Sequence, residues 1–338
     1  MAPPTTDNNN NLAENLQVQF RSVPVTAENH DAKRALIHAM DRVMAVPGER
    51  LLAQAGLLPP VDDGDGVVPK DKQEGRDEPF ALFDNACGMG LITGLLQKQA
   101  SPAVLRESRF VCADLNANLV DIIKWRAETD GWKGAVETAV VDAQDTGLPS
   151  TSFSHVVINF AMHIIPKPDV ALREAYRLLR PNGTLAFTVW THDNTGWIPD
   201  MRSAFAALPF ADNAAAAAAP LMPDRVPMAV HGLNQWIDPA GIRAKLASSS
   251  LHTFNDIHIE TLEHTSHVYS AGYFVESFDM VRKWMMQSYW SEESRQTAAG
   301  MGEARMDEIM INHLQQKHGG KSWDIRWKSI LVTCHKQG

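Results

Sequence analysis

The sequence predicts an α/β fold around a doubly wound, mostly parallel sheet, and three observations support this prediction. Short apolar segments alternate with helical segments from residue 80 to residue 190. The first three apolar segments are each followed by an aspartate, at Asp84, Asp114 and Asp142. A glycine turn, Gly88-Met89-Gly90, comes after the first of them. Strands and helices that alternate at this spacing are typical of parallel sheets, whose ligands bind beyond the carboxyl ends of the strands.

The elements of the sheet follow in chain order. The apolar runs predict strands over residues 80–83, 109–113, 136–141, 155–160 and 184–190, with helices over 91–99, 118–128 and 170–179 between them. Beyond residue 190 we expect helices over 239–248, 271–289 and 291–318, an edge strand at the alternating residues 257–260, and a final strand over 323–335. Residues 204–220 include a run of six alanines and indicate either a helix or a low-complexity loop.

The first 79 residues divide into segments of different composition. Residues 1–26 are polar and predict a disordered tail. Residues 27–58 carry apolar side chains at helical spacing, with a break expected near Pro47, and the acidic, glycine-rich residues 59–79 predict an exposed loop. We expect one ligand-binding domain over 80–338, with the segment 27–58 and cap elements at about 195–250 and 271–318 covering the substrate site.

Composition and charge exclude several classes of protein. Lys and Arg number 31 against 40 Asp and Glu, which gives a net charge of −9. Binding to nucleic acid or to an acidic membrane surface depends on basic residues, so we expect neither partner. Three cysteines are too few for a disulfide scaffold, and the N-terminus lacks the pattern of a secretion signal. We therefore expect a cytoplasmic protein that acts on a small molecule, and the sequence leaves its oligomeric state open.

The aspartates after the strands form the central candidate site. Asp114 lies 24 residues after Gly90, and Asp142 lies 28 residues after Asp114. This order suits a nucleoside: glycines let the backbone approach the ligand, the second acid accepts hydrogen bonds from the ribose hydroxyls, and a group after the third strand binds the base edge. Taken singly, such residues are also typical of turns and helix caps. Their joint order favours the ligand site.

The residues around the turn indicate which kind of nucleoside the site would bind. The segment lacks the third glycine of the dinucleotide fingerprint and the Lys-Ser/Thr pair of a phosphate-binding loop. Asp84, four residues before Gly88, would repel a pyrophosphate and attract a cation. S-adenosylmethionine carries a sulfonium and an ammonium group and no phosphate, so this cofactor is expected in preference to NAD.

Four stretches give the chain a family resemblance: FDNACGMG, CADLNANLVD, VVDAQDTGLPSTSFSHVVINFAMHII and ALREAYRLLRPNGTLAFTVW. They resemble the class I S-adenosylmethionine-dependent methyltransferases. From about Phe80 onward, DNACGMG, DTGLP, TVW…GWIPDMRSAF and YWSEESRQ are similar to the fungal gliotoxin-type thiol methyltransferases and related enzymes of secondary metabolism. The resemblance implies a Rossmann-like, mostly parallel seven-stranded sheet with S-adenosyl-L-methionine as the cofactor.

The resemblance also implies roles for individual residues. Asp84 and the glycine turn would hold the methionine part of the cofactor, Asp114 the ribose, and the residues after the third and fourth strands the adenine. The cofactor-binding set implied in this way is Asp84, Asn85, Ala86, Gly88, Gly90, Asp114, Leu115, Asp142, Ala143, Asn159 and Phe160. Ala86 stands where the family usually has the first glycine of its GxGxG run, as it does in the more similar fungal relatives.

Two histidines are candidates for taking a proton from the acceptor. A thiol with a pKa of ~8.5 is partly ionised at neutral pH, whereas a phenol with a pKa of ~10 needs a base or a hydrogen-bond acceptor. His163 lies four residues beyond Asn159 and is expected to face the methyl-transfer site. His231 lies in the expected cap, near a histidine of the fungal relatives. The alternative for His163 is a pocket or helix-capping histidine that does not titrate, and the alternative for His231 is a loop histidine.

Aromatic residues and the remaining histidines complete the candidate site residues. Trp190, Trp197 and Trp236 are predicted to bind a flat substrate, although tryptophan is also typical of an apolar core. His252, His258, His264 and His267 belong to no metal-binding motif, so no metal site is expected.

The sequence thus predicts transfer of a methyl group from S-adenosylmethionine to a thiol or hydroxyl group of a small secondary metabolite. Two alternatives stay open. One is a protein of this fold that binds S-adenosylmethionine and catalyses a non-methylating reaction or acts as a regulatory subunit. The other is a dinucleotide-dependent oxidoreductase.

Overall fold

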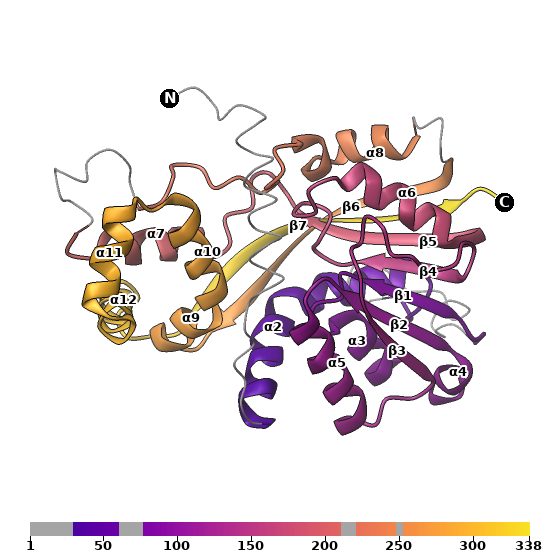
Figure 1. Cartoon of the computed structure of the whole chain (residues 1–338), viewed down its shortest axis with the longest axis horizontal. Coiled ribbons are helices and arrows are strands. Elements are labelled where there is room, and N and C mark those ends of the chain that lie inside the picture. Colours follow the sequence, from indigo (N-terminus) through magenta and orange to yellow (C-terminus); the bar gives the residue numbers. More distant parts are fainter. Residues whose placement is uncertain (1–29, 61–76, 211–220, 248–252) are drawn as a thin grey trace. The chain divides into compact units, whose positions relative to one another are not determined.

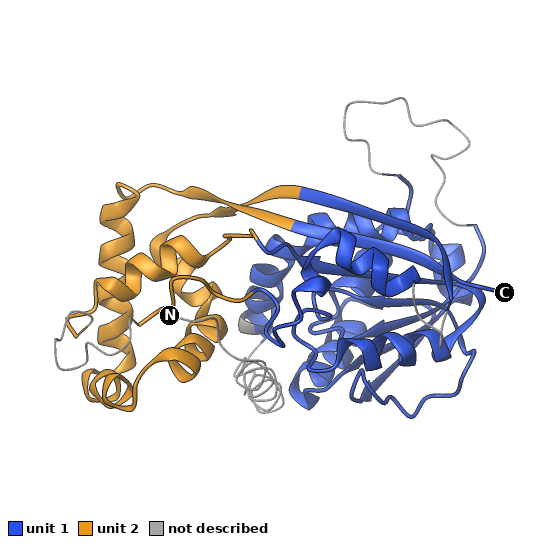
Figure 2. Cartoon of the chain, turned by 90° about the horizontal axis from the view of Figure 1, so that it is seen from above, with its two compact units in different colours: residues 1–192, 228–262, 329–338 blue, residues 193–227, 263–328 orange. Residues whose placement is uncertain are grey.

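The computed structural model describes residues 30–60, 77–210, 221–247 and 253–338. The predicted tail, most of the predicted exposed loop and the six-alanine run lie outside these ranges. The described residues form two compact units (Figure 2). The first unit draws its residues from 1–192, 228–262 and 329–338, and the second from 193–227 and 263–328. The single domain predicted over residues 80–338 is therefore divided.

A seven-stranded sheet with the order β3-β2-β1-β4-β5-β7-β6 forms the centre of the fold (Figure 1). Neighbouring strands from β3 to β5 are parallel, and β7 runs antiparallel to β5. The strands are β1 (Ala81–Asn85), β2 (Arg109–Asp114), β3 (Ala135–Val140), β4 (Phe153–Ile158), β5 (Leu179–Trp190), β6 (Phe254–Val268) and β7 (Trp323–Lys336). The chain reverses its direction of winding between β1 and β4, and in open α/β sheets the ligand crevice lies beyond the carboxyl ends of the strands at such a point. The predicted doubly wound, mostly parallel fold is confirmed, with β6 at an edge.

Helices cover both faces of the sheet (Figure 1). On one face α2 (His30–Gln54), α3 (Leu91–Gln99) and α4 (Pro102–Glu107), which the sequence did not predict, share an apolar cluster with Leu82 and Phe110. On the same face Ile123 of α5 (Ala117–Thr129) packs against Cys112 of β2. On the other face α6 (Pro168–Leu178), the 3-10 helix η2 (Asn234–Ile237) and α8 (Pro239–Ala247) pack against Phe83 and Phe153.

The helix α2 is continuous through Pro47, so the predicted break is wrong. Leu51 and Leu52 are fully buried in the cluster with α3, and Gly48 approaches Leu95 so closely that a Cβ there would lie 3.1 Å from the leucine Cδ1. Burying each leucine contributes roughly 1.5–3 kcal/mol, which offsets the roughly 3 kcal/mol that an interior proline costs a helix. These contacts make α2 part of the core of the first unit, and its role as a cover over the substrate stays a prediction.

The second unit contains the helices α7 (Ile198–Ala206), α9 (Ala271–Ser277), α10 (Asp279–Tyr289), α11 (Glu292–Met301) and α12 (Glu303–Lys317). Each of the two long helices predicted here is divided, at Phe278 and at Gly302. Asp200 of α7 accepts hydrogen bonds from His318 Nε2 at 2.8 Å and from Trp323 Nε1 at 2.9 Å, which fastens α7 to the end of α12. From residue 228 onward, the cap predicted over 195–250 belongs instead to the first unit. Within the described chain, no helix is long and apolar enough to cross a membrane.

Candidate active site

The predicted cofactor residues meet at one edge of the sheet. Asn85 ends β1, Ala86 to Gly90 form the turn after it, and Asp114 ends β2. Asp142 and Ala143 follow β3, and Asn159 and Phe160 follow β4. Because β3, β2, β1 and β4 are neighbours in the sheet, their carboxyl ends bring these residues to a single crevice.

Asp84 is a buried carboxyl group with one oxygen still available. The residue is 1% exposed. Its Oδ2 accepts hydrogen bonds from Thr93 Oγ1 at 2.8 Å and from the Thr93 backbone N–H at 3.2 Å. Its Oδ1 is buried without a hydrogen-bond partner, and burial raises the pKa of Asp84 to about 7. A cation placed at Oδ1 would supply the missing partner and stabilise the carboxylate.

The turn after β1 has an unusual backbone. Ala86, Gly88 and Gly90 have φ values of 52°, 56° and 75°, and a side chain on Gly90 would crowd Trp132 and Ile123 at 3.2 and 3.4 Å. A positive φ at a residue other than glycine is sterically disfavoured, and such residues cluster at functional sites. The conformation of Ala86 therefore marks this turn as a candidate part of the ligand site.

Asp114 joins this turn to the end of β2. Its Oδ2 accepts a hydrogen bond from the Gly88 backbone N–H at 2.9 Å, and its Oδ1 accepts one from the Asn116 backbone N–H at 3.0 Å. Burial raises the pKa of Asp114 above its usual range. Each carboxylate oxygen can accept a further hydrogen bond, so Asp114 can hold the turn and bind ribose hydroxyls at once.

Asp142 lies in a loop that is clamped to α6. Its Oδ1 accepts hydrogen bonds from the backbone and side-chain N–H groups of Gln144, both at 2.9 Å. Further along the loop, the Thr146 backbone N–H donates to Glu174 Oε1 at 2.9 Å. Glu174 in turn pairs with Arg177, whose Nε lies 2.8 Å from Oε2. The loop is thereby fixed beside the crevice.

An aromatic pair stands at the ends of β4 and β5. Phe160 has a φ of 52°, and its ring stacks on that of Trp190 with centroids 4.0 Å apart. Thr188 holds this arrangement, because its hydroxyl donates to Asn159 Oδ1 at 2.7 Å and accepts from the Phe160 backbone N–H at 2.8 Å. The partly exposed Trp190 thus offers a flat apolar surface at the crevice.

The two candidate histidines have different surroundings. His163 is buried, its Nδ1 has no hydrogen-bond partner, and desolvation lowers its pKa to about 3. His231 donates from Nε2 to the Met162 carbonyl at 3.1 Å and accepts the Leu233 N–H at Nδ1 at 3.0 Å. Both nitrogens of His231 are therefore engaged by backbone groups. This geometry gives His231 the role of fixing the segment that carries His163 and leaves it no nitrogen for a substrate proton.

The predicted substrate tryptophans are not alike. Trp190 lies at the crevice, as described above. Trp236 is fully buried in the core of the first unit, 6.2 Å from Phe187 between ring centroids, and its contact with substrate stays a prediction. Trp197 is half-buried at the start of α7 in the second unit. Local sequence does not distinguish these cases, because a tryptophan in a core and one in a binding site share the same apolar neighbours.

The sequence did not predict several side chains that hold the residues of the crevice in place. Thr93, Glu174 and Thr188 fix Asp84, the Asp142 loop and Asn159, and they lie 9, 28 and 29 residues from the groups that they bind. The one local signal is a buried polar residue on an otherwise apolar helix face or strand. Such a residue needs a hydrogen-bond partner, but the sequence does not name it.

The crevice fits a cationic nucleoside. Besides Asp84 Oδ1 and His163 Nδ1, both side-chain polar atoms of Asn85 are buried without a partner. Buried polar groups are nearly always hydrogen-bonded, so these orphaned atoms indicate a polar ligand. The methionine and ribose parts of S-adenosylmethionine supply an ammonium group and hydroxyls that complement carboxylates. In the described part of the chain, no cluster of three His, Cys, Asp or Glu side chains could hold a metal ion.

Comparisons with known proteins show the family of this chain. The family model described as "Methyltransferase domain" matches residues 83–187. Methyltransferase tpcH of Aspergillus fumigatus is 30% identical over 244 residues, which cover 72% of this chain and 80% of that protein. Acetylaranotin bis-thiomethyltransferase of Aspergillus terreus is 31% identical over 147 residues, covering 44% of this chain and 46% of that protein. Phosphoethanolamine N-methyltransferase 2 of Haemonchus contortus, solved with S-adenosyl-L-methionine, aligns with a TM-score of 0.49 at 13% identity, covering 94% of this chain and 60% of that one.

The sheet order, the carboxylates at the strand ends and the similarity to tpcH over most of both chains lead to one conclusion. The chain belongs to the class I methyltransferases, and its cofactor is S-adenosyl-L-methionine.

Proposed function

We propose that the protein transfers the methyl group of S-adenosylmethionine to a thiol of a small, apolar secondary metabolite. The observation that carries this proposal is the state of His163, which lies five residues beyond the end of β4. Buried and neutral, with a pKa lowered to about 3, it is a poor base. A thiol does not need a strong base, because a thiol with a pKa of ~8.5 is partly ionised at neutral pH.

The strand-end residues would divide the binding of the cofactor among them. Asp84 Oδ1 and Asn85 would hold the ammonium and carboxylate of the methionine part, since these are the orphaned polar atoms of the crevice. Asp114 would bind the ribose, with Leu115 beside the adenine, and the Asp142–Ala143 segment would bind the adenine edge. Asn159 and Phe160 would close the site.

In the proposed reaction, the rate depends mainly on how the acceptor is positioned. The bound cofactor supplies an electrophilic methyl group on sulfur, and the displacement is in line, so most of the rate comes from holding the nucleophile against that methyl group. Trp190 would hold an apolar acceptor flat at the end of β5. The Nδ1 of His163 would accept a hydrogen bond from the acceptor and orient it. The name of the acetylaranotin relative, a bis-thiomethyltransferase, also supports sulfur as the acceptor atom.

The function is tested with purified protein, labelled S-adenosylmethionine, and matched thiols and phenols on one aromatic skeleton. We expect label in the thiol products, with S-adenosylhomocysteine released in equal amount. Faster labelling of the phenols would contradict the choice of sulfur. Conversion of a substrate without consumption of S-adenosylmethionine would contradict methyl transfer and favour the non-methylating alternative.

Replacement of His163 by Gln is expected to change thiol methylation less than about threefold but to slow any phenol methylation about tenfold or more, since a phenol stays protonated at neutral pH and depends on the hydrogen bond that His163 Nδ1 would accept. The rate of thiol methylation is expected to rise with pH toward the thiol pKa of ~8.5, with no inflection near 6.5 from a histidine. The exposed His192→Gln is the matched control. Equal slowing of both acceptors would show that His163 only shapes the pocket.

A further inference from the structure

Arg126 is a buried arginine that reaches the cofactor turn from α5. The residue is 3% exposed. Its Nη1 donates hydrogen bonds to the Met89 carbonyl at 2.9 Å and to the Gly90 carbonyl at 3.3 Å. Both carbonyls belong to the turn whose backbone lies between β1 and α3. Charge-assisted hydrogen bonds of this kind are about twice as strong as neutral ones.

The Met89 carbonyl lies before α3 and takes its donor from outside that helix. Thr93 is the third residue of α3, so its N–H is one of the N-terminal donors that have no acceptor inside the helix. This N–H donates to Asp84 Oδ2. The carboxylate of Asp84 thus satisfies a donor at the start of α3, and the guanidinium of Arg126 satisfies two carbonyls of the turn before it.

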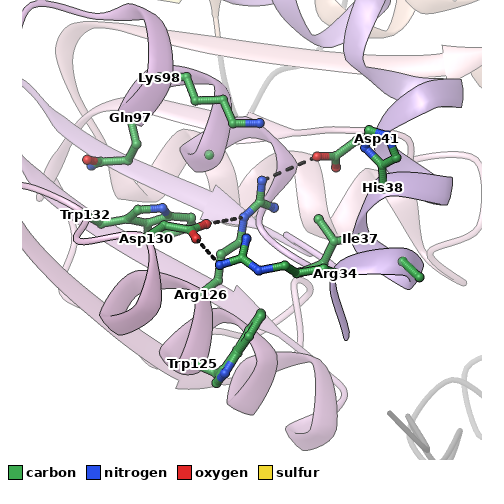
Figure 3. A pocket seen from close by; sticks show the side chains of 12 residues that line it. Arg34, Ile37, His38, Asp41, Gln97, Lys98, Trp125, Arg126, Asp130 and Trp132 are labelled. Atoms are coloured by element: carbon green, nitrogen blue, oxygen red, sulfur yellow. Dashed lines mark hydrogen bonds and ion pairs between the residues drawn. The ribbon is translucent and has the colours of Figure 1, made fainter. Parts of the chain in front are cut away.

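Arg126 also contacts the N-terminal helix. Its Nη2 lies 3.4 Å from Asp41 Oδ2 of α2, and its Nε lies 3.7 Å from Asp130 Oδ2 (Figure 3). Desolvation by burial raises the pKa of Asp41, and the charge of Arg126 opposes that rise. Figure 3 shows the guanidinium between these two carboxylates, at the wall of a pocket of about 480 Å³.

Gly94 leaves the space that the guanidinium occupies. A Cβ at this position of α3 would lie 2.6 Å from Arg126 Nη2 and 2.8 Å from its Cζ. Glycine inside a helix costs about 1 kcal/mol relative to alanine. The close approach of Arg126 is the structural reason for a glycine at this position.

We propose that Arg126 is a positioning residue that sets the shape of the cofactor turn and couples it to the docking of α2. One guanidinium holds two carbonyls of the turn and the carboxylate of Asp41, so a shift of α2 is transmitted to the backbone that receives the cofactor. This inference depends on the cofactor site alone and is independent of the acceptor atom.

The test is Gly94→Ala, because alanine displaces the flexible end of Arg126 while it favours the helix itself. We expect the dissociation constant for S-adenosylmethionine, measured by calorimetry, to rise about tenfold, within the usual range of coupling between sites. The melting temperature is expected to stay within a few degrees of the parent. Gly300→Ala is the matched control, since a Cβ at Gly300 of α11 would meet nothing within 4 Å.

Asp41→Asn tests the link to α2. We expect a smaller rise of the same dissociation constant, and we expect this effect to disappear in the Gly94→Ala background, where Arg126 is already displaced. Arg126→Lys is expected to retain more affinity than Arg126→Met, because lysine keeps one charged donor. The proposal fails if Gly94→Ala binds the cofactor as tightly as Gly300→Ala, or if the effect of Asp41→Asn persists in full in the double variant.

Discussion

Replacement of Asp84 by Asn is expected to abolish tight cofactor binding while the protein stays at least as stable as the parent. Loss of a hydrogen bond between charged groups removes roughly 1.5–3 kcal/mol, so the affinity for S-adenosylmethionine should fall roughly 100-fold. The stability should not fall at neutral pH, because burial already raises the pKa of Asp84 to about 7 and so opposes its charged form. Calorimetry and thermal unfolding measure the two effects.

A second ligand shows which part of the cofactor Asp84 binds. Methylthioadenosine lacks the amino-acid part of the cofactor, so its affinity should survive Asp84→Asn. Asp121→Asn, at a carboxylate with 70% of its side chain exposed on α5, is the control and should change neither ligand. An equal loss for both ligands would assign Asp84 to a general structural role.

The same carboxyl group makes cofactor binding depend on pH. A cationic ligand prefers the ionised form, and a group with a pKa of about 7 is increasingly protonated as the pH falls below 7. We therefore expect the affinity for S-adenosylmethionine to rise with pH through 7, by no more than about tenfold per pH unit on the acid side. Asp84→Asn should flatten this profile, and a profile that is unchanged in the variant would place the titrating group elsewhere.

Replacement of Asp114 by Ala is expected to weaken every adenosine ligand, including methylthioadenosine, by roughly 100-fold or more, since hydrogen bonds to charged groups contribute roughly 1.5–3 kcal/mol each. In contrast to Asp84→Asn, the melting temperature should also fall by several degrees. The reason is that Asp114 accepts the backbone N–H groups of Gly88 and Asn116, which would lose their partners.

Glu137→Ala is the control for Asp114→Ala. Glu137 lies on the neighbouring strand β3 and pairs with Arg109, and the two side chains are 56% and 42% exposed, so the pair should contribute little to stability. The melting temperature of Asp114→Asn should lie between those of the parent and Asp114→Ala. Its amide oxygen can still accept a hydrogen bond from one of the two backbone N–H groups, whereas its NH₂ group faces the other N–H and cannot accept from it. Unchanged affinity for methylthioadenosine in Asp114→Ala would overturn the ribose assignment.

The sequence allowed the sheet and the cofactor edge to be predicted because both are local patterns. The first four strands of the sheet and the helices α3, α5 and α6 were placed within two residues, since an apolar run and the polar turn after it lie together in the chain. Asp84, Asp114 and Asp142 were found for the same reason, as each directly follows a predicted strand. Parallel strands then bring such residues to one edge without any further information.

The errors arose where distant segments meet. Pro47 predicted a break, but burial of Leu51 and Leu52 against α3 keeps α2 intact. Gly302, with a φ of 85°, divides a helix that periodicity alone joined. Helix ends and breaks depend on single backbone conformations, which a periodic pattern does not record.

By itself, the sequence determined the succession of strands and helices along the chain, the acids that follow the strands and the kind of cofactor they suit, because these properties follow from composition and spacing over a few residues. Only the tertiary structure decided which side chains are free to act. It engaged both nitrogens of His231 with backbone groups, enclosed Trp236 in the core, left Asp84 Oδ1 without a partner and brought Arg126 to the turn. The physical reason is that desolvation and hydrogen-bond satisfaction depend on neighbours that can lie tens of residues away in the chain, and these neighbours meet only when the sheet and its two layers of helices have packed.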